Sequence, residues 1–131
     1  MVLTVEDKRP VNLDLTTIKL PLPGFASILH RVSGFAIFLA LPILLWVLDQ
    51  SLMNEGSFAE LQEVLSGFLV KLIIFAILAG LIFHLIAGIK HLLMDAGIGE
   101  TLEGARRGAG ITIALSGLLI LIAGAWLWLP M

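Results

Sequence analysis

The chain has 131 residues, of which 59% are apolar and 14% are charged, and its mean hydropathy is +1.05. Average soluble domains are about 45–50% apolar and about 25% charged, so a soluble chain of this size could not bury so many apolar side chains. Part of its surroundings must be lipid, and the same composition excludes intrinsic disorder. Eight scattered Lys and Arg residues and a net charge of −2 exclude a nucleic-acid footprint.

Cysteine and tyrosine are both absent from the sequence. The chain therefore forms no disulfide, offers no thiol nucleophile and ligates no iron–sulfur cluster through its own thiolates. Any redox or metal chemistry must depend on the three histidines, His30, His84 and His91, or on a partner.

Residues 1–24 are predicted to lie outside the bilayer, at its surface or against another protein. They are rich in charged residues and lack the apolar segment of a signal peptide. The run K-L-P-L-P-G, from Lys19 to Gly24, is expected to prevent a helix from forming just before the first apolar stretch.

Three apolar stretches follow in chain order and predict membrane spans at about 28–50, 68–94 and 108–129. A helix needs about 20 residues to cross about 30 Å of hydrocarbon, and backbone groups in lipid must pair within their own segment. The predicted fold class is therefore all-α, with residues 1–131 forming one transmembrane domain. Gly67 is a possible break before the second span, and a seven-residue glycine repeat predicts close helix packing along the third: Gly110, Gly117 and Gly124.

The distribution of basic residues predicts the orientation. The first loop, residues 49–67, has no basic residue and four acidic ones, whereas basic residues flank the N-terminal side and the second loop: Lys8, Arg9, Lys19, Arg31, Lys90, Arg106 and Arg107. The positive-inside rule then places the N-terminus and the second loop in the cytoplasm and the C-terminus outside.

The first candidate site lies at the start of the first span, in S-I-L-H-R-V-S-G. Ser27, His30 and Arg31 are spaced i, i+3 and i+4, so they share one helix face. A hydroxyl, an imidazole and a permanent cation suit an anionic or carbonyl ligand. The alternative is that Arg31 extends to lipid phosphates, Ser27 caps the helix and His30 is an ordinary interfacial residue.

The second candidate site is the run from His84 to Asp95. His84 lies about 9 Å inward of Lys90, within the hydrocarbon, with glycine one turn before and after it. That clearance suits a planar porphyrin with imidazole as an axial ligand, although His84 could instead be a hydrogen-bonded packing residue. His91 is about 10 Å from His84 along the axis, so a second axial ligand would come from His30 or another polypeptide. His91 and Asp95 could form a hydrogen-bonded pair or a proton entry route, or simply a solvated helix end.

Three motifs in order resemble the cytochrome b large membrane-anchor subunit of succinate dehydrogenase, respiratory complex II. They are R-P-V-N-L-D-L from Arg9 to Leu15, S-I-L-H-R-V-S-G from Ser27 to Gly34, and H-x3-G-I-K-H-x2-M-D-x-G from His84 to Gly97. The resemblance covers essentially the whole chain. One departure is Lys90, where the family commonly has arginine; lysine keeps the charge but loses the planar fork.

The resemblance implies specific roles for these residues. His84 is expected to be an axial ligand of haem b, shared with a small anchor subunit that supplies the other ligand. Ser27 and Arg31 are expected to line a ubiquinone site, with His30, Arg31 and His91 near the haem propionates and Asp95 at a possible proton entry. The three spans would thus form half of a haem-binding helical bundle.

The implied function is electron transfer from succinate to ubiquinone in a bacterial inner membrane, with no catalytic residue in this chain alone. FAD and iron–sulfur clusters belong to two soluble partners, a flavoprotein subunit and an iron–sulfur subunit. The alternatives are the anchor of a quinol–fumarate reductase and a haem-free structural anchor.

Overall fold

The computed structural model describes residues 17–129, and the secondary structure of this part is entirely helical. The helices are α1 (Leu22–Met53), α2 (Glu55–Ser66), α3 (Phe68–Asp95) and α4 (Leu102–Trp128). Three of them, α1, α3 and α4, are long and apolar enough to cross a membrane. The predicted all-α membrane fold is therefore confirmed. The motif at Arg9–Leu15 and most of the segment 1–24 lie outside the described residues.

Two helices begin earlier than the spans predicted from the sequence. α1 begins at Leu22 because Pro21 occupies the N-cap and Pro23 lies in the first turn, where a missing N–H breaks no helical hydrogen bond. The proline run thus starts the helix, and the expectation that it prevents one is wrong for residues 22–24. α4 begins at Leu102, where the Thr101 hydroxyl caps the helix by accepting from the Gly104 N–H at 3.1 Å.

The break at Gly67 is confirmed, because α2 ends at Ser66 and α3 begins at Phe68. α2 is a separate short helix that contacts the end of α1. Its N-terminus is capped by the Asn54 side chain, which accepts from the Ser57 N–H at 2.9 Å.

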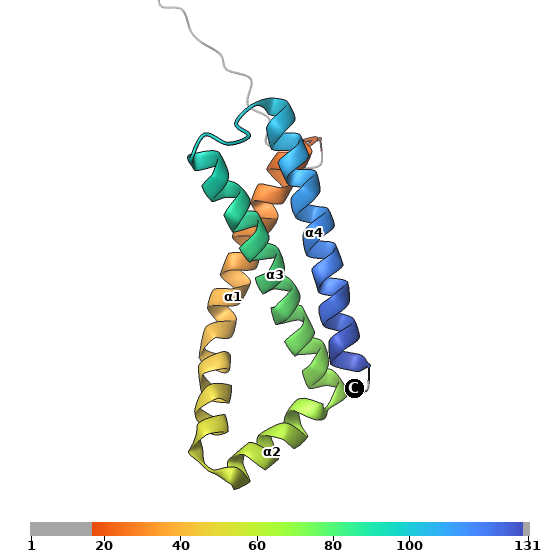
Figure 1. Ribbon diagram of the computed structural model, residues 1–131. Helices are drawn as coiled ribbons and strands as arrows, with labels where there is room; N and C mark the ends of the chain where they lie inside the picture. The colour runs from red at the N-terminus through yellow and green to blue at the C-terminus, as the bar shows by residue number, and fades with distance from the viewer. Residues whose placement is uncertain (1–16, 130–131) are drawn as a thin grey trace, which may run out of the picture.

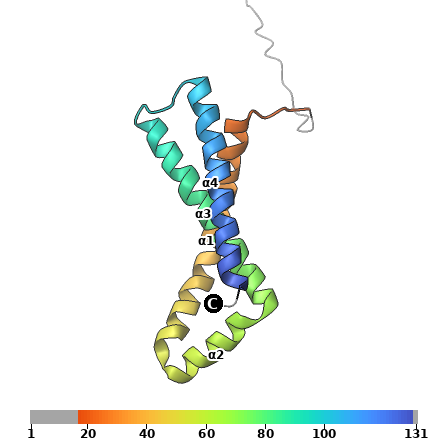
Figure 2. The same cartoon turned by 45° about the vertical axis from the view of Figure 1, so that its right-hand side comes forward.

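The three long helices form one bundle in which α3 contacts both α1 and α4 (Figure 1). α1 and α3 cross and then separate, and α2 bridges their far ends. The start of α1 and the loop 96–101 lie at one end of the bundle, and α2 and the end of α4 lie at the other, as Figure 2 also shows. This arrangement is the one that three crossings of a membrane produce.

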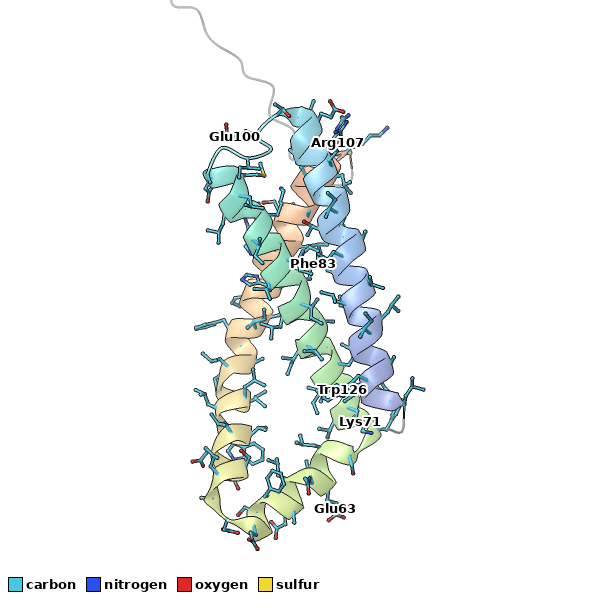
Figure 3. All side chains as sticks on the ribbon, viewed as in Figure 1. Glu63, Lys71, Phe83, Glu100, Arg107 and Trp126 are labelled. Atoms are coloured by element: carbon cyan, nitrogen blue, oxygen red, sulfur yellow. The ribbon has the colours of Figure 1, made fainter. Side chains whose placement is uncertain are left out.

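Charged side chains mark the two ends of the bundle in Figure 3, with Glu100 and Arg107 at one end and Glu63 and Lys71 at the other. Trp126 lies near Lys71, at the end that the basic residues predict to be outside. Between the ends, only 6–11% of the most apolar stretch of each long helix is buried within the chain. The remaining apolar surface requires lipid or partner helices.

Small side chains occupy the buried positions where the long helices meet: Ala26, Ala40, Ala87, Ala109, Thr112 and Ser116. The hydroxyls of the last two donate to backbone carbonyls one turn earlier, so neither is left unpaired. The predicted glycine stripe is only partly used. Gly124 faces Phe75 of α3, but Gly110 and Gly117 have no neighbour that a methyl group would meet within 4 Å among the described residues.

Candidate functional site

The three histidines meet where α1 crosses α3. The ring of His30, on α1, stacks on the ring of His84, on α3, with centroids 4.2 Å apart and an interplanar angle of 11°. The ring of His30 also lies against His91, two turns further along α3, with centroids 5.0 Å apart and an interplanar angle of 40°. All three side chains are half-buried. The crossing therefore joins the two candidate sites of the sequence into a single histidine cluster, His30, His84 and His91.

The close approach of the two helices depends on a glycine in each of them. A methyl group at Gly34 of α1 would lie 2.7 Å from Cε1 of His84, and one at Gly88 of α3 would lie 3.3 Å from Nε2 of His30. Each imidazole thus packs over a glycine of the opposite helix. The clearance at Gly88 that the sequence suggested for a ligand of His84 is used by His30, whereas a methyl at Gly80 would have no neighbour within 4 Å.

The hydrogen bonds of His84 determine which of its ring nitrogens carries a proton. Nδ1 lies 3.0 Å from the carbonyl oxygen of His30 and 3.3 Å from Oγ of Ser33. Ser33 donates its own proton to the same carbonyl at 2.9 Å. The carbonyl oxygen of His30 can only accept, so Nδ1 is the donor in this hydrogen bond. In a neutral imidazole, Nε2 is then left with a free lone pair.

This arrangement fits a haem iron. A histidine that ligates a metal commonly donates its other ring N–H to a carbonyl, which fixes the tautomer and raises the basicity of the ligand. No described residue hydrogen-bonds to Nε2 of His84, so this nitrogen is available to ligate. The donor set is that of a histidine-ligated haem.

His30 is not arranged to supply the opposite axial ligand. Imidazole lone pairs lie in the ring plane, and two axial ligands must point at the iron from opposite faces of the porphyrin. His30 and His84 instead present their ring faces to one another. Nε2 of His30 is buried against Gly88 and has no hydrogen-bond partner among the described residues. In this structure, therefore, His30 does not face His84 across a space that an iron could occupy.

Ser27 and Arg31 lie on α1, one turn before and one residue after His30. Ser27 is half-buried and Arg31 is exposed, and neither forms a hydrogen bond or ion pair with another described residue. α1 begins at Leu22, so Ser27 is not a helix cap, and that part of the alternative is wrong. A hydroxyl and a guanidinium are therefore available to a ligand at this end of the bundle.

Asp95 and Lys90 lie at the same end but outside the histidine cluster. Asp95 is the exposed last residue of α3, and the described contacts include no hydrogen bond between it and His91. The stem of Lys90 packs over Gly108, where a methyl would lie 3.6 Å from its Cγ and Cε, so Lys90 faces α4. Among the described residues, no hydrogen bond joins Lys90 to His84.

Ser33 and Gly34 also belong to the site, although the sequence pattern assigns them no role. They follow His30 at i+3 and i+4, within the motif from Ser27 to Gly34, and this spacing places them on the same helix face. Their contact with His84 could not be predicted from this spacing, because His84 lies on another helix, α3.

Known proteins match the chain over nearly its whole length. The family model described as the succinate dehydrogenase/fumarate reductase transmembrane subunit matches residues 6–123. The succinate dehydrogenase cytochrome b556 subunit of Coxiella burnetii is 40% identical over 92% of this chain and 98% of its own length. The protein of the same name from Paracoccus denitrificans is 32% identical over 87% and 88%. The cytochrome b560 subunit of Reclinomonas americana is 31% identical over 93% and 88%. By the family model and these relatives, the chain belongs to the succinate dehydrogenase/fumarate reductase transmembrane subunit family, the cytochrome b anchors of complex II.

Proposed function

We propose that the chain is the haem b-binding large anchor of a succinate:ubiquinone oxidoreductase. The observation that carries this proposal is the environment of His84, whose Nδ1–H is held by the His30 carbonyl and whose Nε2 lone pair is free. The names of the relatives, cytochrome b556 and b560 subunits of succinate dehydrogenases, support the same cofactor and the same enzyme. They also favour succinate oxidation over the fumarate reductase alternative.

His84 would hold the haem iron through Nε2, and a small anchor subunit would supply the opposite ligand. A haem b bound there supplies a one-electron redox centre inside the membrane. His30 and His91 lie at the same crossing, and Arg31 follows His30 on α1. These residues would present N–H donors to the propionates. FAD and iron–sulfur clusters would reside in the flavoprotein and iron–sulfur subunits.

Ser27 and Arg31 would bind ubiquinone at the end of the bundle where α1 begins. The Ser27 hydroxyl would donate to a quinone oxygen, and the Arg31 cation would stabilise the negative charge that develops there on reduction. Asp95 lies at the same end and could pass protons inward. This end would face the cytoplasm of a bacterial inner membrane, in agreement with the basic residues that flank it.

The test is the reduced-minus-oxidised spectrum of the complex purified with a His84→Ala variant. We expect the spectrum of six-coordinate haem b to be lost or strongly shifted. Leu85→Ala is the matched control, because this neighbouring side chain is 61% exposed. An unchanged haem spectrum in His84→Ala would overturn the ligand assignment, and a wild-type complex without haem would favour a purely structural anchor.

A further inference from the structure

The contacts of His84 with α1 extend beyond the single hydrogen bond to a carbonyl. Its ring lies over Gly34, stacks on His30, and has Ser33 within 3.3 Å of Nδ1. Three neighbouring positions of one helix thus define where the ring lies, how it is rotated and which nitrogen is protonated.

We propose that Ser33 and Gly34 are positioning residues for His84, and that with the carbonyl of His30 they form a seat that fixes the orientation and tautomer of the haem ligand. This inference rests on the proposed function. It assigns to α1, which supplies no ligand itself, control over the electronic character of the ligand on α3.

Gly34 sets the position of the ring. A methyl group there would lie 2.7 Å from Cε1 and 3.2 Å from Nδ1 of His84, closer than ordinary contact, which begins at 3.4 Å. The imidazole is the movable end of a side chain, whereas Gly34 belongs to a continuous helix. Alanine at this position would therefore displace the ring, and with it Nε2.

Ser33 acts on the proton at Nδ1. Its hydroxyl donates to the His30 carbonyl at 2.9 Å and so turns a lone pair toward Nδ1. A hydrogen-bond acceptor at the ring N–H that does not ligate, here Nδ1–H of His84, makes a histidine ligand more basic. A more basic ligand favours ferric over ferrous iron. Loss of the hydroxyl is therefore expected to raise the midpoint potential of the haem.

Another serine of α1, Ser51, allows the contact of Ser33 with His84 to be separated from an ordinary hydrogen bond within a helix. Ser51 is half-buried and donates to the carbonyl of Leu48 at 2.7 Å with the same three-residue spacing, but no hydrogen bond joins it to a histidine among the described residues. Ser51→Ala therefore removes the local bond alone and is the matched control for Ser33→Ala. Gly24→Ala is the control for Gly34→Ala, because a methyl there would make only ordinary contacts at 3.6 Å or more.

The experiment compares these variants in the complete purified complex by redox titration of the haem and by the electron paramagnetic resonance spectrum of the ferric form. We expect Gly34→Ala to shift the low-spin signal or to lose half or more of the bound haem. Ser33→Ala should retain haem with a raised midpoint potential, and Ser33→Thr, which keeps the hydroxyl, should return the potential toward the wild-type value. Both controls should match the wild type.

The proposal is overturned if Ser33→Ala and Gly34→Ala both match their controls in spectrum and potential. If the complex with Gly34→Ala fails to assemble, the midpoint potentials of Ser33→Ala, Ser33→Thr and Ser51→Ala still test the proposal. The His84→Ala spectrum distinguishes this failure from failure of the proposed function. If His84→Ala alters the haem and the seat variants do not, only the seat is wrong; if His84→Ala leaves the haem unchanged, the ligand assignment itself is wrong.

Discussion

The contact between Gly104 and Gly99 allows a quantitative prediction for the loop that joins α3 to α4. A methyl group at Gly104 would lie 2.8 Å from the carbonyl oxygen of Gly99 and 2.9 Å from its Cα, whereas ordinary contacts begin at 3.4 Å. Both atoms are backbone, and Gly99 has a φ of +79°, which favours glycine. Gly104→Ala must therefore move the loop by about half an ångström, and overpacking of this kind destabilises by about 1–3 kcal/mol.

The control is Gly110→Ala in the same helix, where the added methyl has no neighbour within 4 Å among the described residues. Alanine favours a helix interior over glycine by about 1 kcal/mol. Gly110 lies in the interior of α4 and receives this gain, whereas Gly104 lies in the first turn and receives no more than this. The steric penalty acts on Gly104→Ala alone, so we expect it to be less stable than Gly110→Ala by at least about 1–3 kcal/mol. The measurement is the thermal midpoint of each variant chain in the complex purified in detergent. A midpoint for Gly104→Ala at or above that of Gly110→Ala would refute the steric reasoning.

Three further predictions concern the cap, the quinone site and the topology. Thr101→Ala should destabilise by about 1 kcal/mol through loss of the bond from the Gly104 N–H, and Thr101→Ser should not; equal thermal stability of the two variants would contradict the cap. Ser27→Ala and Arg31→Ala should lower electron transfer from succinate to quinone while succinate oxidation by a soluble dye continues. Full quinone reduction by both, with normal assembly, would rule out this quinone site. A reporter fused after Met131 should be active in the periplasm, and a cytoplasmic signal would reverse the orientation.

The helix boundaries show where sequence patterns are reliable and where they are not. The three long helices follow from composition, because lipid accepts only segments whose backbone groups pair internally. The start of α1 was harder to predict, because a proline pair can either interrupt a helix or occupy its first positions. The glycine stripe on α4 illustrates another limit. Gly110 and Gly117 could not be assigned a partner, since the side of a helix that meets its neighbour depends on how the neighbour is rotated.

The sequence by itself determined that this is an all-helical membrane protein. It identified His84 as an ionisable residue within a membrane span, and so as a candidate ligand. It also placed Ser27, His30 and Arg31 on one face of one helix. Only the tertiary structure brought His30 and His84, 54 residues apart, to within 3.0 Å and decided which nitrogen of His84 carries the proton. The physical reason is that helical spacing fixes faces within a helix, whereas the crossing of two helices depends on where both can approach, here at Gly34 and Gly88.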